Sequence, residues 1–508
     1  MALWAENRPE WCAVWIGALI AGLVIVPMDF QLRDEEAAGV LALSGPKALF
    51  LSAKKAQVAE RLRLRAPSVT SLIFLDGTGA DSFAGLGAAP GGGMDPSLPT
   101  LPSADSLSPD DAASIIFTSG TTGLAKGVVL SHHGIISNAN ASILSLPIYD
   151  WDVFMTVLPL HHSYPTTCSF VSPLCVGASF TIVEKLVGKV VIDDIRDSGG
   201  TILIAVPLLY DKVKAAVEQG FKAKGKLVAG ILSGLRKISL GLSRRGKPGF
   251  GRSVFKGIRN TIGIGSIRLM VAGGGPLNPV TADFFESLGF YIVQGYGMSE
   301  NGPLITTNTM KYKNNASAGL VVKYTDLRIL DPNSEGIGEI VVKSPSLMKG
   351  YFQNPEATAE VFTPDGFLKT GDLGRMDSDG FLFITGRKKN IIVTAGGKNI
   401  YPEEIESQFE GSRVIQEILV IGRKKKGQAA EDVFAVVHPD YEAIREDNPE
   451  TEPDDAFVES LIREEIQSVN RGLEHYKKIS DFTIRKEEFE TTATKKIKRY
   501  LYSEYSRG

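Results

Sequence analysis

Residues 114–128 read SIIFTSGTTGLAKGV, and this is the most informative stretch of the chain. The apolar run at 115–117 predicts a buried strand, which leads into a loop rich in glycine and hydroxyl side chains. Backbone N–H groups in such a loop form a concavity for anions, and glycine permits close approach to a ligand. Lys126 adds a mobile positive charge suited to phosphate. The stretch predicts a polyphosphate cradle made of Thr118, Ser119, Gly120, Thr121, Thr122, Gly123 and Lys126.

The loop differs from the common P-loop, in which the lysine is followed by a Ser or Thr that holds Mg²⁺. Here Lys126 is followed by Gly127. A carboxylate elsewhere in the chain must therefore hold the metal. The motif instead resembles the signature loop of the adenylate-forming acyl-activating superfamily, which includes acyl-CoA synthetases and luciferases.

Five further blocks resemble this superfamily and occur in its order. They are GGGPL at 273–277, QGYGMSE at 294–300, TGDLG at 370–374, GRKKNIIVTAGGKNIYPEEIE at 386–406 and TATKKIKR at 492–499. The resemblance implies an α/β fold: a large N-terminal multi-layer α/β domain with a small mobile α+β C-terminal domain. The implied bounds are 1–386 for the AMP-binding domain, 387–389 for the hinge and 390–508 for the mobile domain.

Length and composition agree with a multidomain globular protein. The chain has 508 residues, of which 43% are apolar, and a net charge of -3. This charge gives no overall basic field that would point to nucleic acid. The three cysteines, Cys12, Cys168 and Cys175, show no metal-binding spacing and do not pair evenly, which suits a reducing cytosol. We therefore expect a cytoplasmic protein, with peripheral membrane contact as an open possibility.

Apolar strand candidates recur along the chain with helical patterns between them, which predicts α/β layers. They lie at 115–117, 153–158, 180–183, 202–206, 269–272 and 291–294. Residues 1–75 show the alternation typical of a parallel sheet, and 78–108 read as a loop or linker. Ligands bind at the carboxyl ends of strands in such sheets. The loops at 118–126, 273–277 and 295–300 are predicted there.

The start of the chain carries two expectations. The apolar segment 12–27 is too short for a spanning helix, so Gly22 is predicted to divide it into a buried helix, Val14–Ala21, and a buried strand, Leu23–Val26. The opening MALWAENRPEW resembles the superfamily pattern at the end of an early strand. We therefore expect the chain to lack the first part of the N-terminal domain.

Residues 211–260 are strongly basic, with only Asp211 and Glu218 as acidic residues, and apolar residues interleave at helical spacing. A basic amphipathic helix can lie on an anionic membrane surface. The alternative is a solvated charged face packed on the protein. A long connection at this position also resembles the long-chain fatty acyl-CoA synthetases.

The resemblance implies roles for individual residues around ATP. Glu300 would hold Mg²⁺, which prefers one or two carboxylates together with phosphate oxygens. Tyr296 would stack on adenine and Ser299 would bond the α-phosphate. Asp372 would grip two ribose hydroxyls, and Arg387 would add a contact to the ribose or a phosphate. Gly274, Gly275 and Gly297 belong to the same nucleotide-binding blocks.

Further roles concern the acid and the thiol. Lys496 aligns with the catalytic lysine, although Lys495 stands where relatives have Gly, so Lys495 and Lys498 stay open. Lys389 falls at the hinge, where many relatives have Asp, and Gly396, Gly397 and Lys398 would line the thiol tunnel. His162 is either a ring at the mouth of the acyl pocket or a structural histidine. Metal ligation by His161 and His162 is not expected, because adjacent residues point apart on a strand.

The sequence thus predicts an AMP-forming acid–thiol ligase, a long-chain fatty acid–CoA ligase. It would use ATP, a fatty acid and CoA as substrates, with Mg²⁺ as cofactor. One alternative is an acyl–acyl carrier protein synthetase, whose acidic partner would also suit a basic surface. The other is a non-catalytic lipid-binding relative.

Overall fold

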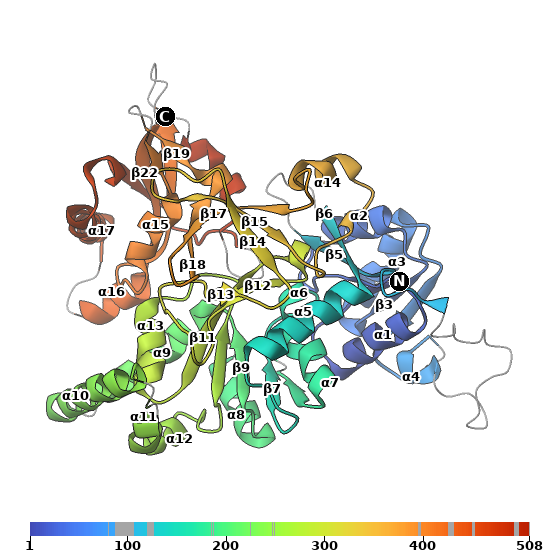
Figure 1. Ribbon diagram of the computed structural model, residues 1–508, viewed down its shortest axis with the longest axis horizontal. Helices are drawn as coiled ribbons and strands as arrows, with labels where there is room; N and C mark the ends of the chain where they lie inside the picture. The colour runs from blue at the N-terminus through green and yellow to red at the C-terminus, as the bar shows by residue number, and fades with distance from the viewer. Residues whose placement is uncertain are drawn as a thin grey trace. The chain divides into compact units, whose positions relative to one another are not determined.

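The computed structural model describes the chain except residues 80, 87–105, 119–125, 184, 186, 224, 246, 248, 395–397, 425–430, 450–452, 492–496 and 507–508. The chain forms two compact units (Figure 1). The first holds the described residues up to 326 together with 342–368. The second holds 327–341 and the described residues from 369 onward.

The largest sheet of the first unit has the order β13-β12-β11-β10-β9-β7-β8. Neighbours from β8 to β11 pair in parallel, whereas β12 and β13 are antiparallel. The strands predicted after residue 150 are all confirmed here. The bounds are β7 (Val153–Thr156), β8 (Ser179–Ile182), β9 (Ile202–Ala205), β10 (Leu269–Ala272), β11 (Tyr291–Gly297), β12 (Leu304–Thr307) and β13 (Leu320–Val321).

Both faces of this sheet are buried, which is why its strands read as continuous apolar runs. On β9, Leu203 and Ala205 join a core with the helices α8 (Gly188–Ser198), α9 (Pro207–Ala223) and α13 (Pro279–Ser287). Ile202 and Ile204 point to the opposite face, since side chains alternate along a strand, and pack near Cys168 and the end of α5 (His132–Ser145). The sheet is thus a layer between two layers of helix.

The N-terminal sheet of the first unit is parallel, as predicted, with the order β2-β1-β3-β4. Helices connect its strands and cover it. The bounds are β1 (Ala2–Trp4), α1 (Pro9–Ile20), β2 (Val26–Pro27), α2 (Asp34–Ser44), β3 (Ala48–Leu51), α3 (Ala56–Arg65) and β4 (Ser71–Phe74). Of the predicted loop at 78–108, the described part contains α4 (Phe83–Leu86).

The bounds predicted for segment 12–27 need correction. The helix begins at Pro9 rather than Val14, because proline at the first helical turn sacrifices no hydrogen bond and has a helix-compatible φ. Gly22 does end the helical region, in a left-handed conformation with φ +67°. The strand is shorter than predicted and begins at Val26, and the Leu23 side chain is exposed.

A smaller sheet of the first unit has the order β16-β6-β5, with bounds β5 (Ala112–Thr118), β6 (Lys126–Ser131) and β16 (Gly350–Tyr351). All of its pairs are antiparallel. Helix α14 (Pro355–Val361) follows β16. A helical stretch after β7 comprises α6 (Ser163–Pro165), the π-helical η3 (Thr166–Val171) and α7 (Ser172–Val176).

The basic segment is helical, as its spacing predicted. It forms most of α9, then α10 (Lys226–Ser243), α11 (Gly249–Val254) and α12 (Lys256–Thr261). Helix α10 packs against α9, α11 and α13 (Figure 1). In the described part of the chain, no helix has both the length and the apolar character needed to cross a bilayer.

The described residues of the second unit form three sheets, with the orders β14-β15-β17-β18, β19-β20 and β21-β22-β23. Val458, Ile462 and Ile466 recur at helical spacing on α17 and pack in the core of the last sheet. The bounds are β14 (Asp326–Leu330), β15 (Gly338–Lys343), β17 (Leu368–Met376), β18 (Leu382–Arg387), β19 (Ile392–Val393), β20 (Asn399–Ile400), α15 (Pro402–Glu406), β21 (Ile415–Lys424), β22 (Glu431–Pro439), α16 (Tyr441–Asp447), α17 (Asp455–Gly472) and β23 (Asp481–Ile484).

Candidate active site

The predicted phosphate loop connects the two strands of a hairpin. Thr118 at the end of β5 lies opposite Lys126 at the start of β6. The strand predicted before the loop is therefore confirmed. Ser119, Gly120, Thr121, Thr122 and Gly123 lie outside the described residues, so their role as a cradle stays a prediction.

Lys126 and Glu300 meet at a residue that the sequence analysis missed. The Tyr351 hydroxyl donates a 2.9 Å hydrogen bond to Glu300 Oε1. The Lys126 Nζ lies 4.8 Å from the centre of the same ring, a cation–π distance. Tyr351 reaches this position because β16 pairs with β6, which places Tyr351 opposite Val128. The phenol thus holds two predicted site residues in one place.

The segment that carries Glu300 is held by buried polar contacts. Asn138 on α5 donates to the carbonyls of Asn301 and Leu304, at 3.0 Å each, and accepts from the Leu304 amide at 2.9 Å. The Glu300 carbonyl accepts from the Met348 amide at 2.8 Å. Buried polar groups satisfied in this way define one backbone position, so the Glu300 carboxylate is presented from a fixed backbone.

Ser299 is tied to the segment after β7. Its Oγ lies 3.0 Å from the Oγ of Ser163 in α6. Ser163 follows His162 directly, so two blocks that the sequence analysis treated separately meet here. Each hydroxyl can donate and accept, which leaves Ser299 able to bond a further oxygen.

Two glycines in the predicted nucleotide blocks stand at positions that disfavour any side chain. Gly274 has a φ of +82°, a conformation that costs glycine little. A side chain at Gly297 would collide with the backbone of Pro303, since its Cβ would lie 2.1 Å from the Pro303 oxygen. The Gln294 side chain fixes the turn after β10, because its Oε1 accepts from the Leu277 amide at 2.6 Å. Tyr296 is half-buried on β11, opposite Thr306.

His161 and His162 do not point apart, contrary to the sequence-based argument. They lie in the turn after β7 rather than on a strand, and their Nε2 atoms are 3.1 Å apart. Burial, followed by the nearby His162, lowers the pKa of His161 well below its usual value. Burial also lowers the pKa of His162, while Asp29 acts in the opposite direction. This arrangement favours neutral imidazoles, one donating to the other.

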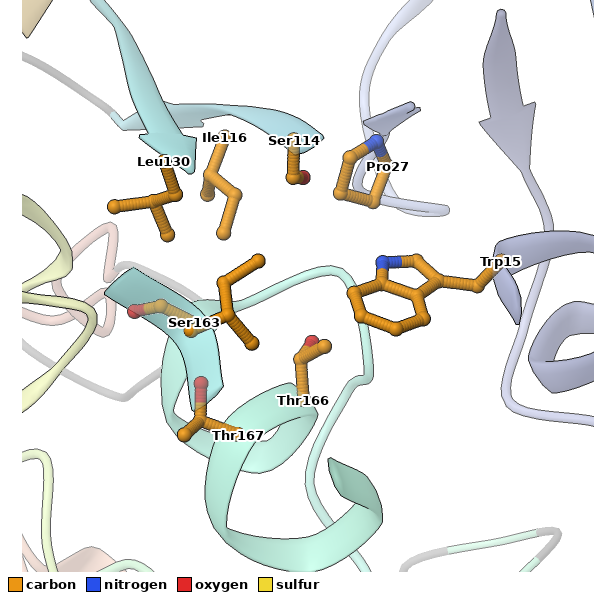
Figure 2. A pocket seen from close by; sticks show the side chains of 9 residues that line it. Trp15, Pro27, Ser114, Ile116, Leu130, Ser163, Thr166 and Thr167 are labelled. Carbon is orange, nitrogen blue, oxygen red and sulfur yellow. The ribbon is translucent and has the colours of Figure 1, made fainter. Parts of the chain in front are cut away.

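A small cavity in the first unit is lined in part by Ser163, which follows His162 in the chain (Figure 2). Its volume is about 10 Å³, which is room for about one water molecule. Trp15 Nε1 and Ser114 Oγ face it and have no hydrogen-bond partner among the described residues. Ser163, Thr166 and Thr167 line the other side. In this conformation the cavity suits a bound water rather than an acyl chain.

In the second unit, Asp372 and Arg387 lie opposite each other on β17 and β18. The Arg387 Nε is 2.8 Å from Asp372 Oδ1, and the Asp372 side chain is largely buried. The two residues predicted to bind ribose or phosphate are therefore neighbours. An arginine that also bonds the carboxylate fixes the orientation of that carboxylate.

The predicted hinge lies between two polar contacts of the second unit. Lys388 pairs with the largely buried carboxylate of Glu339 at 2.7 Å. Asn390 donates to Glu403 Oε1 at 2.5 Å. Lys389 stands between these two anchored residues. Lys398 donates its backbone N–H to Thr394 Oγ1 at 3.1 Å, while Gly396, Gly397, Lys495 and Lys496 lie outside the described residues.

The only metal ligand expected from the sequence is Glu300. Among the described residues, no group of three His, Cys, Asp or Glu side chains could hold a metal ion unaided. Mg²⁺ is commonly held by one or two carboxylates together with substrate phosphates. A carboxylate has about four lone-pair sites, and the Tyr351 hydroxyl occupies one of them. The Glu300 side chain therefore fits a phosphate-bound Mg²⁺.

Comparison with known proteins extends these observations. The sequence profile of the AMP-binding enzyme family matches residues 1–352, and that of the AMP-binding enzyme C-terminal domain matches 389–506. The long-chain-fatty-acid–CoA ligase FadD15 of Mycobacterium bovis is 30% identical, with 99% of this chain and 86% of the relative covered. A long-chain-fatty-acid–[acyl-carrier-protein] ligase of Arabidopsis thaliana, AEE15, is 27% identical, covering 70% of this chain and 55% of its own.

Among solved structures, ATP-bound MatB from Rhodopseudomonas palustris superposes with a TM-score of 0.76. The two chains are 24% identical, and 99% of this chain and 88% of MatB are covered. This similarity concerns the fold, a large N-terminal α/β domain with a smaller C-terminal domain. The family matches, the FadD15 relative that covers 99% of this chain and the shared fold agree, and the chain belongs to the AMP-binding enzyme family of adenylate-forming fold.

Proposed function

We propose that the protein is an ATP-dependent long-chain fatty acid–CoA ligase that acts through an acyl-adenylate. The convergence of Lys126 and Glu300 on Tyr351 carries this proposal, because it joins a cation and a carboxylate where ATP phosphates and Mg²⁺ are expected. The full-length relative FadD15, a long-chain-fatty-acid–CoA ligase, supports the class of acid.

A carboxylate is a poor electrophile, because its leaving group would be an oxide. In the first step a carboxylate oxygen forms a bond to the α-phosphorus. The bond from the α-phosphorus to the oxygen that bridges the α- and β-phosphates breaks. Pyrophosphate leaves with the electron pair. The protein must position two anions and neutralise charge. In the second step the thiol sulfur attacks the acyl carbon, AMP leaves, and the thiol proton is released.

Residues between 118 and 300 would bind the phosphates and the adenine base. Thr118, Lys126 and the loop at 119–123 would cradle the β- and γ-phosphates, and Ser299 would bond the α-phosphate. Tyr296 would stack on adenine beside the backbone at Gly274, Gly275 and Gly297. Glu300 would hold Mg²⁺, which when bound neutralises phosphate charge. His162 would stand at the mouth of the acyl pocket.

Residues of the second unit would complete each step. Asp372, oriented by Arg387, would accept hydrogen bonds from the ribose hydroxyls. Lys496 would bridge the carboxylate and the α-phosphate during adenylation. We further propose that a C-terminal domain, 390–508, rotates on 1–386 about Lys389 within the hinge 387–389. Gly396, Gly397 and Lys398 would then line the path of the thiol.

The main alternative concerns the thiol that accepts the acyl group, which would be acyl carrier protein instead of CoA. The AEE15 relative is a ligase for acyl carrier protein, and the basic helices α9–α12 would suit an acidic protein. The third candidate function is that of a non-catalytic lipid-binding relative. The meeting of Lys126, Tyr351 and Glu300 disfavours it.

Thioester formation tests the proposal. The purified protein should convert long-chain acids such as palmitate to acyl-CoA with ATP and Mg²⁺, and should act much more slowly on acetate. Release of pyrophosphate that requires holo acyl carrier protein and ignores CoA would establish the carrier-protein reading. Absence of product with every acid and both thiols would support the non-catalytic reading.

A further inference from the structure

The exposed face of α10 stands out on the surface of the first unit. Leu227, Ile231 and Ile238 have exposed fractions of 79%, 57% and 55%. At 100° per residue these three positions fall within about 40° of one another, so they form one stripe along the helix. Leu232, Leu235 and buried Ser239 face the protein on the adjoining side of α10, about 60–120° around the helix from the middle of the stripe.

The cations of this region differ in what they contact, and some pair with carboxylates, such as Lys214 with Glu218 and Arg244 with Asp283. Arg236 stacks on Phe284 and donates to Ser287, and Arg259 donates to the carbonyls of Gly265 and Ile267, so these two serve the fold. Lys226, Lys237 and Arg245 are exposed on α10 or just after it. No carboxylate pairs with these three within the described part of the chain, and the sequence contains no Asp or Glu from 219 to 282.

We infer that the outward face of α10 docks on an anionic lipid surface. The charge complementarity is direct, because three unpaired cations border the apolar stripe. A free acidic protein would match the cations but would leave the three exposed aliphatic side chains of the stripe without an apolar partner. Such side chains gain free energy by entering the boundary between lipid headgroups and acyl chains. The docking surface is therefore the stripe Leu227, Ile231, Ile238 with Lys226, Lys237 and Arg245.

This inference goes beyond the proposed ligase function, since docking requires neither ATP nor acid. It also narrows the expected membrane contact from the whole basic segment 211–260 to one face of α10. If the substrate is a long-chain acid, which partitions into bilayers, docking would bring the enzyme to the phase that holds the acid.

Co-sedimentation of the full-length protein with vesicles tests the inference. We expect binding to phosphatidylcholine vesicles that contain phosphatidylglycerol, and weak binding to phosphatidylcholine alone. Binding should fall steeply as salt rises, because exposed charges are screened. Leu227→Ser should weaken binding about ten-fold, as expected when a leucine loses its apolar burial. Lys237→Gln with Arg245→Gln should weaken it by a similar factor or more.

Matched variants show whether the effect belongs to α10. Leu64 on α3 is 84% exposed, so Leu64→Ser removes an equally exposed leucine elsewhere. Lys189→Gln removes an exposed cation of α8. Both controls should bind vesicles like the wild type, and Leu227→Ser should keep its activity on a water-soluble acid.

Several outcomes would overturn the inference. One is no binding to anionic vesicles, and another is equal, salt-independent binding to both kinds of vesicle. A third is a loss of vesicle binding in Leu64→Ser as large as the loss in Leu227→Ser. Binding to acyl carrier protein that depends on Lys237 and Arg245, without vesicle binding, would assign the face to the carrier protein.

Discussion

The Tyr351 hydroxyl donates a 2.9 Å hydrogen bond to Glu300 Oε1, and this contact joins β16 to the block that follows β11. Hydrogen bonds to charged groups contribute about 1.5–3 kcal/mol. The same phenol ring faces the ammonium of Lys126. The bond therefore orients the carboxylate next to a cation.

Tyr351→Phe should slow adenylation about ten-fold or more, because the variant keeps the ring under Lys126 and loses the bond that orients Glu300. ATP binding should change little, as measured by calorimetry. Tyr351→Leu, which also loses the ring, should be slower still. A Tyr351→Phe enzyme with unchanged adenylation would show that the hydroxyl does not position Glu300.

Glu300→Gln should bind ATP nearly normally and lose about two or more decades in adenylation rate, as is typical when a transition-state charge contact is removed. Single-turnover formation of acyl-AMP measures this. The exposed Glu356, in the first turn of α14, gives a matched control, and Glu356→Gln should behave like the wild type. Near-normal turnover of Glu300→Gln would remove this residue from the metal site.

Lys496→Ala should separate the two half-reactions. A contact made only in the first transition state affects that step alone. Acyl-AMP formation should collapse, and transfer from pre-made acyl-AMP to CoA should stay within a few-fold of wild type. Gly397→Leu should do the reverse by blocking the thiol path. Equal damage to both steps in Lys496→Ala would refute the rotation or the choice of lysine, and Lys495→Ala and Lys498→Ala would then decide between the alternatives.

The buried pair of His161 and His162 should make the free energy of unfolding decrease as the pH falls. His161 is buried with a lowered pKa, whereas an unfolded histidine titrates near about 6.5. The unfolded state therefore binds more protons below that pH, and the contribution to stability present above about pH 6.5 is lost as pH falls further. Between pH 7 and pH 5 the wild type should lose more unfolding free energy than His161→Gln.

Urea unfolding at the two pH values measures this difference. Parallel losses in the wild type and His161→Gln would mean that His161 does not titrate as its burial implies.

Patterns local in sequence predicted much of the fold. The strands predicted after residue 150, the hairpin strand β5 and the basic helices could be found because their apolar residues occur in short runs or at helix spacing. The start of α1 was predicted too late because Pro9 precedes the apolar segment 12–27 in which the helix was placed. Helix boundaries depend on such single capping positions.

Contacts between distant segments could not be predicted in this way. Tyr351 lies in a plain GYF stretch with no phosphate-binding pattern, and its role arises from the pairing of β16 with β6. The same holds for Ser163 with Ser299 and for Asn138 with Leu304. The convergence of His161 and His162 depends on a turn where a strand was assumed. Tertiary pairing, rather than spacing, sets these positions.

The most direct test of the account is exchange of labelled pyrophosphate into ATP in the absence of any thiol. Exchange reports reversible acyl-AMP formation and does not depend on which acceptor the enzyme uses. We predict exchange that requires Mg²⁺ and a long-chain acid, is weak with acetate and is lost in Glu300→Gln. A folded protein that binds ATP and shows no acid-dependent exchange at any chain length would contradict the account.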